Sequence, residues 1–270
     1  MNTAERIRKH GFTPVKKYGQ NFLTDGNIIA KIVAAAEPAA SDLVIEIGPG
    51  LGALTFALAE RAGRVTAVEA DEKVVPLLAE AAGEAGIGNT EIVSMDFLDY
   101  ALPASGAYKL VGNLPYYITT PILMKAAEAG NLPQLAVFMM QKEVARRVTA
   151  APGSRIYGSV SVAVQYRFDA EYLFEVSREV FIPKPGVDSS VIRLRPRRDE
   201  RKARDEKTFF ALVRAGFGQR RKMLRNSLRA AGFTDAAVEA AFEQTGIAPT
   251  ARAEELSVND FIALADAVID

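Results

Sequence analysis

Apolar and polar positions between residues 42 and 140 follow a repeating order of short buried runs and longer helical segments. Five runs are predicted to be strands: residues 43–47, 64–68, 91–94, 108–112 and 135–140. Helices are expected between them, at 53–61, from Asp71 as an N-cap, and from Thr120–Pro121, where proline is tolerated at the first helical position. Strands that alternate with helices predict an α/β fold with a parallel, doubly wound sheet.

The pattern changes after Gln141. Residues 171–176 and 189–194 have the composition of strands and are separated by a Pro/Gly-rich segment rather than a helix. We expect them to form an antiparallel hairpin at the sheet edge. Residues 195–206 are charged and suggest a linker, and apolar residues recur at helical spacing from Lys207 onwards. The chain is therefore predicted to form a large domain over residues 1–198 and a small helical domain over residues 199–270.

Composition restricts the possible chemistry. The chain has 270 residues, 49% of them hydrophobic, and no apolar run approaches the roughly 20 residues that span a bilayer. No membrane association is expected, and the first residues carry no apolar signal segment, so a cytoplasmic location is predicted. There is no cysteine, and His10 is the single histidine. Disulfides, cysteine nucleophiles, histidine triads and multi-histidine metal sites are excluded, and no metal is expected.

Charge is balanced overall, with 33 basic and 33 acidic residues, but it is unevenly distributed. Residues 193–229 contain fourteen Lys and Arg against four Asp and Glu. A basic segment on an otherwise acidic protein suggests a surface that binds a polyanion such as nucleic acid. A solvated charged linker followed by a basic helix is the alternative interpretation.

The first chemical signal follows the first predicted strand, in the segment Glu46-Ile47-Gly48-Pro49-Gly50-Leu51-Gly52. Glycines at alternate positions after a strand let the backbone approach a ligand closely, where a Cβ would clash. By itself this turn is compatible with a dinucleotide site, a nucleoside site or a tight turn without a ligand.

Two further strand ends narrow these possibilities. Glu69 lies 21 residues after Gly48, at the end of the second strand, where a carboxylate accepts hydrogen bonds from ribose hydroxyls. Asp96 and Phe97 follow the third strand, and are expected to bind the adenine amino group and ring. The G-x-G-x-G spacing and the carboxylate of Glu46 disfavour a pyrophosphate and suit a cationic sulfonium. The set therefore favours S-adenosylmethionine over NAD.

The most specific signal is Asn113-Leu114-Pro115-Tyr116, directly after the fourth predicted strand. Side chains here project from the carboxyl edge of the sheet, where open α/β folds bind ligands. A purine amino group is a poor nucleophile because its lone pair is delocalised, so its methylation needs acceptors for its two hydrogens and an in-line methyl donor. The Asn113 side-chain oxygen and the Leu114 carbonyl can be those acceptors. Pro115 fixes the turn, and Tyr116 can stack on an extruded base.

Together these motifs resemble the ribosomal RNA adenine N6,N6-dimethyltransferases (the KsgA family), over nearly the whole chain. Residues 19–23 are similar to the family segment that covers the cofactor, which implies contacts at Asn21 and Leu23; Asn113 is expected to contact the cofactor as well as the base. Residues 181–189 resemble the target-base loop, in which Phe181 packs on the other face of the adenine. Residues 217–228 resemble a basic helix, and the implied RNA-binding residues are Arg220, Arg221, Lys222 and Arg225.

The resemblance implies a Rossmann-like methyltransferase fold with S-adenosyl-L-methionine as cofactor and S-adenosylhomocysteine as product. It implies dimethylation of two adjacent adenosines in the 3'-terminal hairpin loop of 16S rRNA, within the immature 30S subunit. A monomer is expected. Reasoning from the residues alone reaches only adenine N6 in a nucleic acid.

Four alternatives remain at this point. One is the antibiotic-resistance enzyme that dimethylates a single adenosine of large-subunit RNA, which shares these motifs. The others are an adenine-N6 DNA methyltransferase, which would need a target-recognition domain, a non-catalytic RNA-binding protein on a methyltransferase fold, and an NAD dehydrogenase. The intact Asn113–Tyr116 loop and the ending 252–257 favour the small-subunit enzyme.

Overall fold

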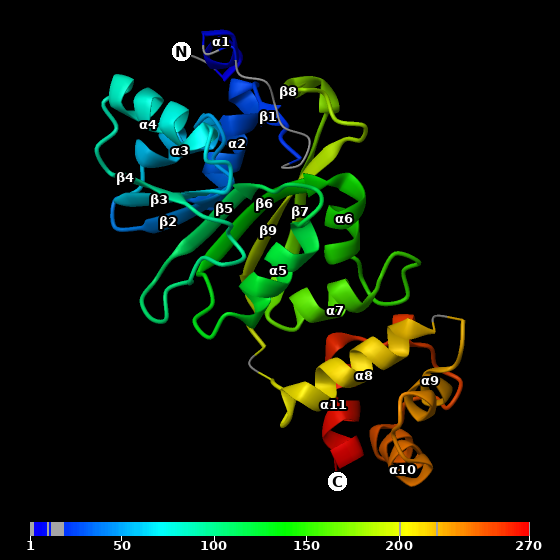
Figure 1. Ribbon diagram of the computed structural model, residues 1–270. Helices are drawn as coiled ribbons and strands as arrows, with labels where there is room; N and C mark the ends of the chain where they lie inside the picture. The colour runs from blue at the N-terminus through cyan, green and yellow to red at the C-terminus, as the bar shows by residue number, and fades with distance from the viewer. Residues whose placement is uncertain (1–2, 10, 12–18, 200, 220, 270) are drawn as a thin grey trace. The chain divides into compact units, whose positions relative to one another are not determined.

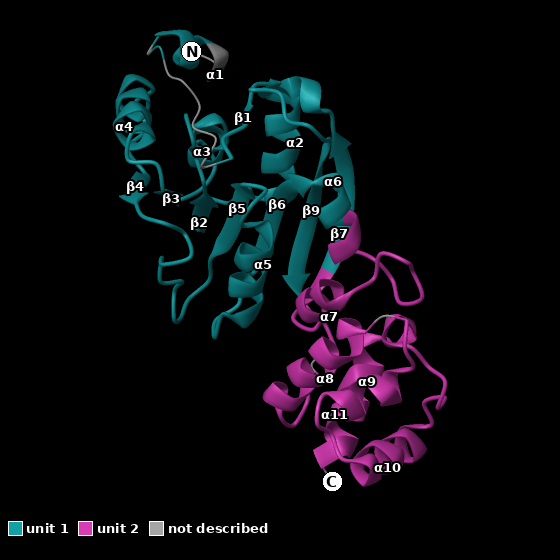
Figure 2. Cartoon of the chain, turned by 45° about the vertical axis from the view of Figure 1, so that its right-hand side comes forward, with its two compact units in different colours: residues 1–145, 170–196 teal, residues 146–169, 197–270 magenta. Residues whose placement is uncertain are grey.

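The chain forms two compact units. The computed structural model describes residues 3–9, 11, 19–199, 201–219 and 221–269, and so His10 and Arg220 lie outside the described residues (Figure 1). Unit 1 comprises Met1–Ala145 and Ala170–Pro196, and unit 2 comprises Arg146–Asp169 and Arg197–Asp270 (Figure 2).

Within the described residues, unit 1 is built on a seven-stranded sheet with the order β4-β3-β2-β5-β6-β9-β7. The strands are β2 (Leu43–Ile47), β3 (Arg64–Glu69), β4 (Thr90–Ser94), β5 (Lys109–Asn113), β6 (Leu135–Gln141), β7 (Phe168–Val176) and β9 (Ser189–Pro196). The first five are parallel, and β9 pairs antiparallel to β6. The predicted α/β sheet is therefore confirmed, with its antiparallel strand inserted between β6 and β7. Because β2, β3 and β5 are parallel neighbours, their carboxyl ends meet at one edge.

Helices with buried apolar faces cover the sheet. The helices of this unit are α1 (Thr3–Lys9), α2 (Gly26–Ala36), α3 (Ala53–Ala59), α4 (Val74–Glu84) and α5 (Thr119–Glu128); α6 (Lys142–Val148) crosses the boundary between units. Figure 1 shows α2, α3 and α4 on one side of the sheet and α5 on the other. Ile32 of α2 and Leu58 of α3 pack with Val44, Val111 and other strand residues in one buried cluster, so burial of these apolar faces stabilises the sheet.

A second, two-stranded sheet was not expected from the pattern. β1 (Phe22–Leu23) pairs antiparallel with β8 (Phe181–Ile182), with Leu23 opposite Phe181. This pairing joins segments about 160 residues apart in sequence and fixes the chain just before α2. It also places the Phe181 side chain in the apolar cluster of the sheet, with 3% of its surface exposed.

Unit 2 is helical. It contains α7 (Ser159–Gln165), α8 (Glu206–Gly218), α9 (Leu224–Ala230), α10 (Asp235–Thr245), the short 3-10 helix η3 (Ala253–Glu255) and α11 (Val258–Ile269). Phe209 and Leu212 of α8 and Phe261 of α11 form its buried core. The Tyr166 ring stacks on Phe209 with 4.2 Å between centroids.

Two boundaries differ from the sequence expectation. Residues 146–169 were expected within the domain 1–198, but they group with the helical unit, since Tyr166 stacks in its core and its hydroxyl contacts Glu206. Asp71 was expected to cap the helix after β3, yet α4 begins at Val74 with Lys73 as N-cap. Asp71 instead closes a turn by accepting a hydrogen bond from the Lys73 N–H. No helix among the described residues is long and apolar enough to cross a membrane.

Candidate active site

The loop after β2 forms the floor of a pocket at the carboxyl edge of the sheet. Gly48 and Gly50 have φ of +64° and +55°, values that residues other than glycine rarely adopt. A Cβ on Gly50 would lie 2.8 Å from the Phe22 ring, so only glycine allows Phe22 to cover this loop. The predicted close approach of backbone to a ligand is therefore available at these two residues.

Glu69, at the end of β3, is fixed by two backbone donors. Its Oε2 accepts from the Gly50 N–H at 3.0 Å and its Oε1 from the Asp71 N–H at 2.9 Å. Each carboxylate oxygen has a second lone pair and can still accept from a hydroxyl, which suits the two hydroxyls of a ribose. Burial raises the pKa of Glu69 above its usual value.

Glu46, the fourth of the five residues of β2, is a buried acid with 1% of its surface exposed. Burial raises its pKa to about 8. Within the described part of the chain, its Oε2 is buried and lacks a hydrogen-bond partner. A buried carboxyl with an unused acceptor is costly unless a ligand completes it. The amino and sulfonium groups of S-adenosylmethionine would supply positive charge and donors here, so this residue fits that cofactor better than a pyrophosphate.

The side of the pocket after β4 carries Asp96 and Phe97. Asp96 is exposed and accepts from the Leu98 N–H at 2.8 Å, while Phe97 is buried. Lys125 of α5 donates to the Leu98 carbonyl at 2.7 Å and lies over the Phe97 ring at 5.8 Å. An acidic acceptor beside an aromatic ring suits an adenine with its amino group.

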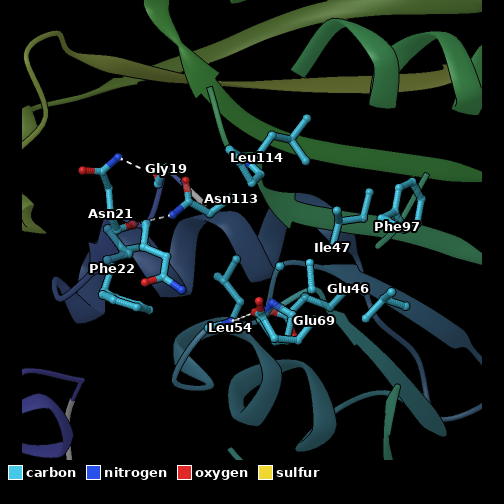
Figure 3. Close-up of a pocket in the computed structure, with 18 of the residues that line it drawn as sticks. Gly19, Asn21, Phe22, Glu46, Ile47, Leu54, Glu69, Phe97, Asn113 and Leu114 are labelled. Atoms are coloured by element: carbon cyan, nitrogen blue, oxygen red, sulfur yellow. Dashed lines mark hydrogen bonds between the residues drawn. The ribbon is translucent and has the colours of Figure 1, made fainter. Parts of the chain in front are cut away.

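Asn113 ends β5 and faces the segment that precedes β1. Its Nδ2 donates to the Asn21 carbonyl at 2.9 Å, as Figure 3 shows, and this directs Oδ1 away from Asn21. The Leu114 N–H donates to the Met139 carbonyl of β6 at 2.8 Å, which fixes the following peptide. The Pro115 carbonyl accepts from the Thr119 hydroxyl at 3.0 Å, at the first position of α5.

The side chain of Tyr116 is fixed through its hydroxyl group. Its hydroxyl hydrogen-bonds to the Oγ of Ser189, the first residue of β9, at 2.9 Å. Ser189 is fully buried, and burial raises the pKa of Tyr116, so the phenol stays neutral. The ring therefore has a fixed orientation beside Asn113.

The structure brings most of the predicted site residues into this one pocket, which has a volume of about 940 Å³ including the part open to solvent. Its lining includes the predicted residues Asn21, Leu23, Glu46, Gly48, Gly50, Glu69, Asp96, Phe97, Asn113, Leu114, Pro115 and Tyr116. Gly52 and Phe181 are not part of the lining; Gly52 is the N-cap of α3, and Phe181 is buried in β8. Stacking of Phe181 on a base stays a prediction.

The predicted RNA-binding residues belong to unit 2. Arg221 and Lys222 are exposed, but they lie in the turn between α8 and α9 rather than in the expected basic helix. Arg225 lies in α9, with its Nη1 4.0 Å from a Glu239 carboxylate oxygen. Their contact with RNA stays a prediction.

Sequence reasoning missed several residues that shape the pocket. Phe22 covers Gly50, Gln20 binds Asp71, and Ser189 fixes Tyr116. Gln20, Phe22 and Ser189 lie within the segments 19–23 and 181–189 that the family resemblance had marked. Their partners are 28 to 73 residues away and give no local signal.

Comparison with known proteins identifies the family. The profile of the ribosomal RNA adenine dimethylase family matches residues 11–270. The chain belongs to this family. A relative in Pelotomaculum thermopropionicum, "Ribosomal RNA small subunit methyltransferase A", is 47% identical over 98% of this chain and 95% of its own length.

Solved structures agree with this assignment. A dimethyladenosine transferase from Plasmodium falciparum has a TM-score of 0.81 and 26% identity, over 90% of this chain and 95% of that one. The 23S rRNA methyltransferase ErmE has a TM-score of 0.74 and 30% identity, over 93% of this chain and 100% of that one. Family and fold together imply use of S-adenosylmethionine, as the sequence predicted, and not of NAD.

The raised pKa of Glu46 predicts how the stability of the protein depends on pH. Its pKa is raised to about 8 in the folded state, so folding favours its protonated form. The resulting contribution to stability is complete below the unfolded pKa and is lost as the pH rises to about 8; its size is on the order of 5 kcal/mol. We expect Glu46→Gln to remove this loss. The melting temperature of the variant minus that of the wild type should therefore increase as the pH is raised from 5 to 8.5.

The exposed Glu72 provides the matched control, since Glu72→Gln should leave the pH dependence unchanged. Parallel curves for wild type and Glu46→Gln would contradict the raised pKa.

Proposed function

We propose that this enzyme transfers methyl groups from S-adenosyl-L-methionine to N6 of two adjacent adenosines in the 3'-terminal hairpin loop of 16S rRNA, dimethylating each. The substrate is the immature 30S subunit, and the enzyme acts as a monomer in the cytoplasm. The observation that carries the proposal is the orientation of the Asn113 amide, with its Nδ2 bound to the Asn21 carbonyl and its Oδ1 left for the target amine.

The reaction needs help because the adenine amino group is a weak nucleophile. Asn113 Oδ1 and the Leu114 carbonyl accept its two N–H hydrogens, which draws the nitrogen lone pair out of the ring and toward the methyl donor. The new N–C bond forms as the C–S bond breaks, and the extra proton on nitrogen then leaves to water. No general base is required for that loss, because the methylated cationic amine is acidic.

Base capture is assigned to Tyr116. Its ring, oriented by the hydrogen bond to Ser189, provides a stacking surface for an adenine turned out of the RNA. Phe181 is proposed to pack on the other face of that base. Since the Phe181 side chain is buried in the apolar cluster of the sheet, this second contact requires that side chain to turn out of the cluster when RNA binds.

The donor is proposed to lie across the glycine loop. Glu69 would bind the ribose hydroxyls, and Asp96 and Phe97 would bind the adenine. Glu46 would lie next to the positively charged methionine end. The remaining residues proposed to contact the cofactor are Asn21, Leu23, Gly48, Gly50 and Gly52. When bound, S-adenosylmethionine supplies an electrophilic methyl group, and S-adenosylhomocysteine is released.

The choice of small-subunit RNA rests on relatedness. The relative named for the small subunit is 47% identical, whereas the 23S rRNA methyltransferase ErmE is 30% identical. Arg220, Arg221, Lys222 and Arg225 of the helical unit are proposed to contact RNA phosphates, which would make the affinity salt-dependent. Dimethylation of 23S rRNA is the second candidate function, because ErmE shares the fold.

The catalytic assignment predicts a large effect of Asn113→Ala. Loss of one preorganised polar group of this kind usually lowers the rate by about two to three orders of magnitude. We expect at least a hundredfold loss of methyl transfer with retained binding of S-adenosylhomocysteine, measured by calorimetry. Asn27→Ala, at an exposed asparagine of α2, should have no effect. Unchanged methyl transfer in Asn113→Ala would make the assignment wrong.

The substrate assignment predicts where labelled methyl groups are incorporated. Immature small subunits should be modified at two adjacent adenosines, and naked 23S rRNA should remain unlabelled under the same conditions. Labelling of 23S rRNA alone would favour the second candidate function.

A further inference from the structure

The two halves of the pocket are joined through Gln20, a residue to which the proposed function gives no role. Its Nε2 donates to Asp71 Oδ2 at 2.6 Å. Gln20 lies on the segment that leads into β1, whereas Asp71 lies in the loop after β3, beside the proposed ribose site. A hydrogen bond to a carboxylate is short and strong, so this contact fixes the two segments to each other.

Asp71 is itself fixed by two further hydrogen bonds, to Lys73 and to Glu69. It is buried, its Oδ1 accepts from the Lys73 N–H at 3.0 Å, and its own N–H donates to Glu69 Oε1 at 2.9 Å. A shift of the Glu69 carboxylate therefore changes the position of Asp71 and of any group bound to it. The Gly50 N–H on the other Glu69 oxygen extends the same network into the glycine loop.

On the other side, Gln20 precedes the residue whose carbonyl orients the catalytic amide. The Asn21 carbonyl accepts from Asn113 Nδ2 at 2.9 Å, and the Asn21 side chain donates to the Gly19 carbonyl at 3.0 Å. Figure 3 shows the Asn113 side chain directed at the Asn21 backbone, while the Asn21 side chain is directed at Gly19. The position of the Asn21 carbonyl decides whether Oδ1 or Nδ2 of Asn113 is presented to the base, and Gln20 is one peptide bond away.

We infer that Gln20 is a positioning residue that couples donor binding to the orientation of Asn113. The coupling runs from Glu69 through Asp71 and Gln20 to the Asn21 carbonyl. Ligand hydroxyls on Glu69 fix Asp71, Asp71 fixes Gln20, and the adjacent carbonyl then holds the amide with Oδ1 toward the target amine. The inference rests on the proposed role of Asn113 as the amine acceptor.

Gln20→Met tests this coupling, because methionine keeps the length and volume of the side chain but cannot donate to Asp71. If Gln20 acts only through Asn113, Gln20→Met lowers kcat about tenfold or more, since small misplacements of a catalytic group are costly. In an Asn113→Ala background the same change has no further effect on kcat. If Gln20 only stabilised the fold, Gln20→Met would lower kcat by the same factor in the wild-type and in the Asn113→Ala background.

A second readout does not depend on catalysis. Binding of S-adenosylhomocysteine should slow amide hydrogen exchange at residues 20–23 and 48–52 in the wild-type protein. In Gln20→Met, protection at 48–52 should remain and protection at 20–23 should be lost. The matched control is Arg64→Met, which breaks the exposed Arg64–Glu91 ion pair of the same sheet and should behave as wild type.

The outcomes separate the two proposals. Equal protection at 20–23 in Gln20→Met and wild type would overturn the coupling, whatever the kinetics show. Full activity of Asn113→Ala, with protection still lost in Gln20→Met, would instead overturn the proposed role of Asn113 while leaving the connection between the segments intact.

Discussion

The hydrogen bond from Asn113 Nδ2 to the Asn21 carbonyl is the contact on which the proposed chemistry of this pocket depends. An amide has a donor end and an acceptor end of nearly the same shape, and the adenine amino group can use only the acceptor end. The backbone carbonyl of Asn21 accepts from the donor end, which leaves the oxygen for the proposed role of binding the adenine amino group. The fold must therefore hold the segment before β1 against the end of β5, although they are 92 residues apart.

Several features of unit 1 hold the segment before β1 against the end of β5. The β1–β8 pair fixes the segment on one side, and the Gln20–Asp71 hydrogen bond fixes it on the other. Because the strands carrying Glu46, Glu69 and Asn113 are parallel neighbours, the groups assigned to the donor and the acceptor converge on one sheet edge. The carboxyl of Glu46 is buried, and its Oε2 has no hydrogen-bond partner among the described residues, so a ligand that brings positive charge and N–H donors fits this part of the pocket.

Much of this arrangement could be predicted from the sequence because it is local. β2 was predicted with its observed bounds, 43–47, and the pocket residues at the ends of β2, β3, β4 and β5 followed from strand-and-glycine spacing. The β1–β8 pair could not be predicted, since two-residue strands have no periodicity. The grouping of residues 146–169 with the helices depends on Tyr166 reaching Phe209, a contact between distant segments. The buried position of Phe181 has the same origin, in the pairing of β8 with β1.

We propose that this enzyme dimethylates adenine N6 in small-subunit RNA. The most direct measurement is mass spectrometry of 16S rRNA from cells with and without this protein, with nucleosides and hairpin fragments resolved. We expect N6,N6-dimethyladenosine at two adjacent positions of the 3'-terminal hairpin when the protein is present, and unmodified adenosine at both when it is absent. Dimethyladenosine of equal abundance in both samples would contradict it.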